Sequence, residues 1–154
     1  MTPPSGGQHL RAALDVPHDP GAIGKAEERV LDALAAFSFP KASVFAVRLC
    51  LHEAISNAFR HGHRNLPPHT PISLRYDVSA ERVEILVEDQ GPGFDPGAVP
   101  DPTADENLER GSGRGLLLIR AYMASAEYNA KGNALRMVYQ RPADVGGISN
   151  SPSI

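Results

Sequence analysis

Residues 41–62 read as one long helix that is apolar almost all round, bounded by Pro40 and Gly62. Proline before a helix and glycine at its end are common boundary residues. One side of this helix carries an apolar stripe at helical spacing, formed by Val44, Val47, Leu51, Ala54, Ile55 and Ala58. The opposite side is also apolar, with Ala46, Leu49 and Cys50. A helix of this kind must be covered on both sides, so the chain must pack other elements over more than one face of it.

The remaining periodic segments predict the partners of this helix. Apolar residues recur at helical spacing in residues 24–37 and 114–125. Alternation typical of strands is found in residues 9–16, 72–78, 83–87, 126–130 and 134–140. The first strand is expected at a sheet edge, and the second and third are expected to form a hairpin. The pattern predicts an α+β fold, a two-layer α/β sandwich with a mixed, mostly antiparallel sheet and helices on one face.

The 14 glycines and 14 prolines mark the expected domain boundaries. They are frequent in residues 1–8 and 142–154, which are predicted to be flexible tails on either side of a domain at residues 9–141. A third Gly- and Pro-rich stretch, at about residues 90–112, lies inside that domain. A segment of about 20 residues without regular structure in a compact domain is either a wrong assignment of the elements or a functional lid.

Composition excludes several classes of protein. The chain has 15 Lys and Arg against 18 Asp and Glu, for a net charge of -3, which argues against direct binding of nucleic acid. No apolar run reaches the roughly 20 residues of a membrane span, and the polar N-terminus does not resemble a signal peptide. A single cysteine, Cys50, excludes an intrachain disulfide and a cysteine-rich zinc site. The protein is therefore expected to be soluble and cytoplasmic.

Glu53, Asn57 and His61 stand four residues apart on the long helix and share one face. Apolar residues surround that face, and an unpaired buried charge is costly, so these polar groups need partners. A carboxylate one turn from an amide oxygen suits a general base beside a Mg²⁺ ligand, because Mg²⁺ prefers oxygen ligands and takes few of them from protein. The alternative is a solvated helix face without function, and the spacing alone does not separate the two.

A second group of polar residues and glycines follows the strand at residues 83–87. With the period of a strand, Asp89 falls on the same face as that strand's apolar residues, so its carboxylate points toward the core. Gly91 and Gly93 remove side chains where a ligand can approach the backbone. An ordinary turn explains the glycines but not the direction of Asp89. A buried acceptor beside an open floor favours recognition of an exocyclic amine such as adenine N6.

A glycine-rich loop at residues 110–116, with the sequence Arg-Gly-Ser-Gly-Arg-Gly-Leu, opens the last predicted helix. Such loops expose backbone N–H groups and the positive end of the helix dipole, which bind phosphate. This one is not a Rossmann fingerprint, because no strand precedes it, and no glycine-rich stretch ends in the Gly-Lys-Ser/Thr of a P-loop. Taken alone, it could equally be a flexible linker.

His61 and His63 form a His-x-His pair that also suggests a metal site. No third ligand is clustered with them, so the interpretation preferred here is that they are surface histidines at a helix end.

The three motifs occur in a fixed order: Glu-x-x-x-Asn on a helix, Asp-x-Gly-x-Gly-Phe after a strand, and Gly-x-Gly-x-Gly-Leu before a helix. They resemble the N, G1 and G2 boxes of the GHKL ATPases, which include gyrase and the histidine kinases. The resemblance runs from about residue 9 to residue 140. Residues 51–62 (LHEAISNAFRHG) and 108–119 (LERGSGRGLLLI) look especially like the anti-sigma factor serine/threonine kinase branch. A Bergerat-type ATP-binding fold is implied, with the stretch at about residues 90–112 as its ATP lid.

The resemblance also implies a role for each motif. Glu53 would be the catalytic base that takes a proton from the attacking hydroxyl, and Asn57 would bind the Mg²⁺ that bridges the ATP phosphates. Asp89 would accept a hydrogen bond from the adenine amino group, while either Arg110 or Arg114 would reach the γ-phosphate. The implied nucleotide-binding residues are Asn57, Asp89, Gly91, Gly93, Phe94, Arg110, Gly111, Ser112, Gly113, Arg114, Gly115 and Leu116.

At the level of function, the resemblance implies an ATP-dependent serine/threonine protein kinase that is also an anti-sigma factor. Such proteins hold a sigma factor inactive and phosphorylate an anti-sigma factor antagonist in a partner-switching system. Homodimers through the region of residues 9–37 are implied as well. Two alternatives remain open: a nucleotide-gated, non-catalytic module that binds a regulator, and the catalytic module of a split histidine kinase.

Overall fold

The computed structural model describes residues 7–63, 65–93 and 112–143, except for the side chains of residues 112–114. Its elements are, in order, β1 (His9–Val16), α1 (Pro20–Ala36), α2 (Lys41–Asn57), the π-helical turn η1 (Ala58–Gly62), β2 (Ile72–Ser79), β3 (Arg82–Glu88), α4 (Ser112–Tyr122), β4 (Ser125–Tyr128) and β5 (Ala134–Gln140).

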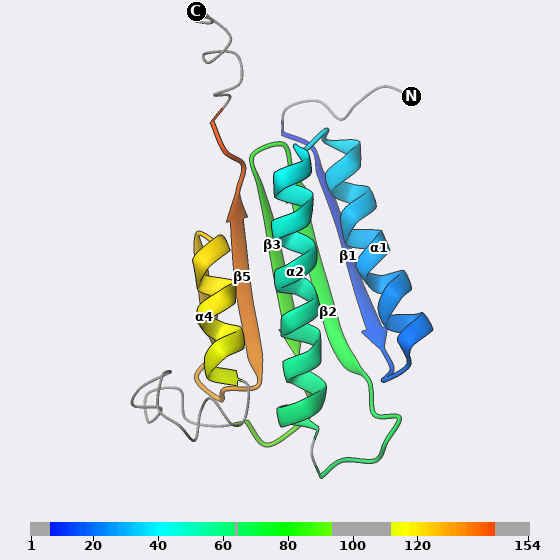
Figure 1. The fold of residues 1–154 in the computed structure, drawn as a ribbon. Helices are drawn as coiled ribbons and strands as arrows, with labels where there is room; N and C mark the ends of the chain where they lie inside the picture. Colours follow the sequence, from blue (N-terminus) through cyan, green and yellow to red (C-terminus); the bar gives the residue numbers. More distant parts are fainter. Residues whose placement is uncertain (1–6, 64, 94–111, 144–154) are drawn as a thin grey trace, which may run out of the picture.

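The five strands form one sheet in the order β1-β2-β3-β5-β4, and each of the four pairings is antiparallel. β1 lies at one edge and β2 and β3 form a hairpin, as the alternating segments predict. Figure 1 shows α1, α2 and α4 side by side over one face of this sheet, with α2 in the middle. The expected α+β sandwich with helices on one face is therefore confirmed, but its sheet is antiparallel in all described pairings and not mixed as predicted.

The core lies between the sheet and the helix layer. Alternate residues of neighbouring strands point into it in register, so that Tyr76 is paired with Ile85 and Ile85 with Met137. In α2, Leu51 of the predicted stripe and Cys50 of the opposite side are both fully buried. The helix is thus covered on both sides, which its all-round apolar sequence requires.

The opposite face of the sheet is polar, and none of the described helices covers it. Asp77 on β2 accepts hydrogen bonds from Arg11 and His9 on β1. Glu84 on β3 pairs with Arg136 on β5. Charged pairs across neighbouring strands are typical of a face that is open to water.

Each of the three predicted helices differs from the sequence prediction at a boundary, and α4 spans Ser112–Tyr122 where the sequence predicts residues 114–125. α1 begins at Pro20 rather than residue 24, because the Asp19 side chain accepts a hydrogen bond from the N–H of Ala22 and caps the helix. The long helix keeps α-helical geometry only to Asn57, and its last turn, η1, is π-helical. Such turns are rare and are often found at functional sites.

A buried hydrogen bond joins the first turn of α2 to β5, where the Tyr139 hydroxyl donates to Ser43 Oγ at 2.8 Å. Replacing Tyr139 with phenylalanine leaves the fully buried Ser43 without this partner, and we expect a loss of about 1–3 kcal/mol in unfolding free energy. Chemical denaturation of the single variant and of the Tyr139→Phe/Ser43→Ala double variant measures this. The double variant should recover part of the loss, and a fully stable single variant would contradict the prediction.

Candidate functional site

The carboxylate of Asp89 sits just past the end of β3, packed against the backbone of Gly62. A Cβ atom added at Gly62 would lie 2.2 Å from Asp89 Cγ, which leaves no room for any side chain there. The backbone N–H of Gly91 donates to Asp89 Oδ1 at 2.8 Å. The sequence pattern predicts Gly62 as a helix end, and no local signal indicates its contact with the carboxylate.

Gly91 is required by a second close approach in the same place. A Cβ atom at Gly91 would lie 1.9 Å from the carbonyl oxygen of Gly62. Two backbones can come this near only where both residues lack a side chain. The end of η1 and the loop after β3 are therefore in direct backbone contact, and the Asp89 carboxylate lies beside this contact.

Asn133 holds Asp89 from the other side. The N–H of Asp89 donates to the Asn133 carbonyl at 2.8 Å, and Asn133 Nδ2 donates to the Asp89 carbonyl at 3.0 Å. Asn133 is only 6% exposed, and the turn that carries it is closed by Asn129 Oδ1, which accepts from the N–H groups of Gly132 and Asn133. The sequence predicts only that this segment connects the strands at residues 126–130 and 134–140, and its local pattern does not indicate that a buried side chain there fixes Asp89.

Gly93 meets the same turn. It adopts a φ of 79°, and a Cβ atom there would lie 2.0 Å from the carbonyl oxygen of Lys131. Glycine is the residue that accepts both this backbone conformation and this contact. The loop from Asp89 to Gly93 is thus pressed between η1 and the turn before β5.

The electrostatics of Asp89 favour a ligand that donates a hydrogen bond. Burial raises the pKa of its carboxyl above the ordinary value, and the charge of Glu88 raises it further. The N–H of Gly91 and the positive charges of Lys131 and of His63, when protonated, act in the opposite direction. Burial removes water that would otherwise donate hydrogen bonds to the carboxylate oxygens. A ligand that donates a hydrogen bond to their remaining lone pairs therefore stabilises the charged form.

Glu53 and Asn57 form a second centre on the same helix, at the first turn of α4. A Cβ atom at Gly115 would lie 2.7 Å from Asn57 Nδ2 and 3.3 Å from Glu53 Oε2. The structure therefore brings together two motifs that are more than fifty residues apart in the sequence. Figure 1 shows the end of α2, the end of β3 and the start of α4 at the same end of the molecule.

Asn57 carries an unusual polar atom. The residue is 6% exposed, and its Oδ1 has no hydrogen-bond partner among the described residues. A buried carbonyl oxygen left without a partner is costly and is also the type of ligand that Mg²⁺ prefers. The donor set therefore fits a Mg²⁺ ion held by Asn57 with phosphate and water oxygens as its other ligands.

Cys50 lies one turn before Glu53 and is not a candidate nucleophile. Burial, together with the nearby charge of Glu53, raises the pKa of its thiol to about 11. The thiolate, which is the reactive form, is therefore scarce at neutral pH.

The structure does not describe all of the residues that the resemblance implies. Phe94, Arg110 and Gly111 lie outside the described residues, as does most of the expected lid. The backbone of residues 112–114 (Ser112, Gly113 and Arg114) belongs to the first turn of α4. Leu116 is partly buried and packs against the hydrophobic core.

The histidine pair does not gather further ligands in the part of the chain that the structure describes, where no group of three His, Cys, Asp or Glu side chains could hold a metal ion. His63 is instead held by the loop after β3, because the N–H of Gln90 donates to its Nε2 at 2.9 Å.

The described helices include none that is long and apolar enough to cross a membrane.

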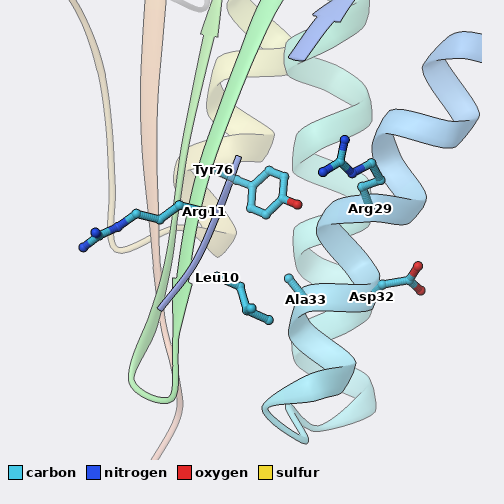
Figure 2. A pocket seen from close by; sticks show the side chains of 6 residues that line it. All are labelled: Leu10, Arg11, Arg29, Asp32, Ala33 and Tyr76. Atoms are coloured by element: carbon cyan, nitrogen blue, oxygen red, sulfur yellow. The ribbon is translucent and has the colours of Figure 1, made fainter. Parts of the chain in front are cut away.

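A separate hollow of about 370 Å³ lies between β1 and α1 (Figure 2). It is lined by Leu10, Arg11, Arg29, Asp32, Ala33 and Tyr76. Leu10 and Tyr76 belong to the part of the sheet near the β2–β3 turn, whereas Asp89 follows the far end of β3. This hollow is therefore distinct from the glycine-lined site.

Comparison with known families and proteins gives consistent matches. The family model described as "Histidine kinase-like ATPase domain" matches residues 16–139. The chain is 27% identical over 122 residues to the serine-protein kinase RsbW of Oceanobacillus iheyensis, covering 75% of this chain and 77% of that protein. It is 30% identical over 100 residues to the anti-sigma F factor of the same organism, covering 61% and 67%. The serine-protein kinase RsbW of Staphylococcus epidermidis is 30% identical over 98 residues, covering 59% and 62%.

Proposed function

Since the chain belongs to the family of histidine kinase-like ATPase domains, we propose that it is an ATP-dependent protein kinase and an anti-sigma factor, which phosphorylates a serine or threonine of an antagonist protein. The observation that carries this proposal is the packing of Gly115 on Glu53 and Asn57, at the end of the helix whose next turn touches Asp89. The continuous helical segment of α2 and η1 therefore contacts two candidate binding sites, one for the phosphates of ATP (the phosphate end) and one for its adenine (the adenine end).

At the adenine end, the Asp89 carboxylate accepts a hydrogen bond from the amino group of adenine. Its position is fixed by the close approach of Gly62 and by the hydrogen bond from the N–H of Gly91, so the acceptor is held in place before the ligand binds. This explains why a carboxyl group whose pKa is raised by burial is retained at the end of a strand.

At the phosphate end, Asn57 Oδ1 would hold a Mg²⁺ ion, which would supply positive charge to neutralise the ATP phosphates. Glu53 takes the proton from the attacking serine or threonine hydroxyl. The hydroxyl oxygen forms a bond to the γ-phosphorus as the bond from that phosphorus to the β–γ bridging oxygen breaks, and ADP leaves. Arg110 or Arg114 compensates charge on the transferred group, as phosphoryl transfer requires.

The names of the relatives support the partners in this proposal. A serine-protein kinase matches 75% of this chain and an anti-sigma F factor matches 61% of it. We therefore propose that it sequesters a sigma factor and phosphorylates a protein antagonist. From the family resemblance alone we also propose a homodimer formed through residues 9–37, the region that contributes most of the hollow in Figure 2.

The test is phosphoryl transfer to an antagonist candidate, a small protein encoded next to this one. The two proteins are incubated with radiolabelled ATP and Mg²⁺, and the labelled residue is mapped by mass spectrometry. Label on an antagonist serine or threonine is expected. ATP binding without transfer to any antagonist tested would favour the non-catalytic binding module, and label on a histidine of a partner chain would favour the split histidine kinase.

A further inference from the structure

His63 lies between the end of η1 and the loop that carries Asp89. Its ring packs edge-on against Phe59, at 5.5 Å between ring centroids. The other side of Phe59 is covered by His18, stacked at 4.3 Å and nearly parallel. The ring of His63 is thus held in place by packing within a row of three aromatic rings and is not a freely rotating surface side chain.

The hydrogen bond from the Gln90 N–H to His63 Nε2 has a chemical requirement. A ring nitrogen accepts only when it carries no proton, so the neutral ring must be protonated at Nδ1 alone, and a fully protonated ring cannot accept at all. Gln90 lies between Asp89 and Gly91, and its side-chain amide donates to the Pro71 carbonyl at 2.8 Å. Two hydrogen bonds therefore hold the loop at Gln90, and the one to His63 exists only while the His63 ring is neutral.

Proton uptake by His63 would change the site in two ways. The Gln90 N–H would lose its acceptor, and a positive ring would stand near the Asp89 carboxylate, with which it interacts electrostatically. The other charged groups that act on that carboxylate are Glu88 and Lys131, while His18 and His61 are the titratable neighbours of His63 across Phe59 and within η1. A positive ring near Asp89 competes with any amine that the carboxylate is to bind.

We propose that His63 is a positioning residue for the loop from Asp89 to Gly91, and that protonation of its ring weakens nucleotide binding. This inference rests on the proposed function, because it takes Asp89 as the acceptor for the adenine amine. It makes nucleotide occupancy depend on whether the His63 ring carries a proton, and therefore on pH.

Two substitutions separate the hydrogen bond from the titration. His63→Gln offers a carboxamide oxygen near the place of Nε2, which accepts from the Gln90 N–H but does not titrate. His63→Phe keeps the ring packing on Phe59 and removes the acceptor. His18→Gln is the matched control, since it changes the histidine on the other side of Phe59, which has no contact with Gln90 among the hydrogen bonds that the structure describes.

The affinity for ATP with Mg²⁺ is measured by calorimetry on the full chain at pH 8 and pH 5.5. Titration of the ATP phosphates is common to all variants, so the ratio of each variant's dissociation constant to that of the parent removes it. We expect His63→Gln to match the parent at pH 8 and to bind several-fold more tightly than the parent at pH 5.5. His63→Phe should bind about tenfold more weakly than the parent at pH 8, and His18→Gln should follow the parent at both values.

Equal ratios for His63→Gln at both pH values would overturn the proposal, and so would parent-like affinity of His63→Phe at pH 8. The hydrogen bond is checked without nucleotide through the NMR resonance of the Gln90 amide, which should follow the titration of His63 in the parent and stay fixed with pH in His63→Gln. If the parent bound no ATP while this resonance still followed His63, the proposed function would fail and the positioning of the loop would stand. An amide that ignores His63 would overturn the positioning itself.

Discussion

Replacing Glu53 with glutamine should lower the rate of phosphoryl transfer to the antagonist by about 10²–10⁴-fold, the usual contribution of a positioned general base. Glutamine has nearly the same size, so its packing against Gly115 is preserved while its ability to take a proton is lost. The affinity for ATP should stay within about twofold, because Glu53 is assigned to the attacking hydroxyl and not to the nucleotide. Single-turnover transfer and calorimetry measure the two quantities separately.

Glu28→Gln on α1 is the control for this experiment, since Glu28 is exposed on a different helix. It should transfer phosphate at the parent rate. Transfer by Glu53→Gln at a similar rate would remove Glu53 from the chemistry, and a parallel loss of ATP binding would assign it to the nucleotide instead.

Asp89→Asn should weaken ATP binding by about 10–100-fold, the worth of a hydrogen bond to a charged group. The N–H of Gly91 already occupies one side-chain oxygen at this position. If the new amide keeps its oxygen there, its NH₂ group faces the adenine amine, so that two donors meet. Calorimetry at pH 7 measures the loss, with Asp15→Asn on the exposed surface of β1 as a control that should bind normally.

The same substitution should not destabilise the protein in the absence of nucleotide. The pKa of Asp89 is raised in the folded chain, so as pH rises the unfolded chain releases this proton first, and the folded state loses stability between the ordinary and the raised pKa. Above that window the ionised carboxylate is a constant cost, which a neutral amide does not carry. Thermal melting at pH 7 should therefore show Asp89→Asn to be as stable as the parent or more stable, with the difference shrinking as the pH falls toward 4. A lower melting temperature at pH 7 would mean that weaker ATP binding reflects damage to the fold.

Much of the architecture could be predicted from periodicity because it depends on local pattern. β1 and β5 begin and end at the predicted residues, since alternation there reports directly which side chains face the helices. The motifs were enough to indicate the histidine kinase-like family, which the comparisons confirm. The alternation of β3 also predicted that Asp89 points inward, and the structure places its carboxylate against the backbone of Gly62.

The remainder of the site depends on contacts between distant segments, which no local pattern encodes. The role of Asn133 follows from two hydrogen bonds to the backbone of a residue 44 positions away. The need for glycine at position 62 appears only when the loop at Gly91 is placed against it. His63 is predicted as a surface residue at a helix end. Its hydrogen bond with Gln90 is seen only when η1 and the loop after β3 are brought together.

Because the backbones of Gly62 and Gly91 are in contact, the number of residues between Asn57 and Gly62 is constrained as well as their identity. Asn57 and Gly62 belong to one continuous helical segment, so the two ends of the site are set apart by a count of residues. Inserting one residue between them would rotate Gly62 by about 100° around the helix axis and advance it by about 1.5 Å, away from the loop that it meets. Variants of this chain can therefore exchange the exposed side chain of Arg60 in η1 far more freely than they can add or remove a residue there.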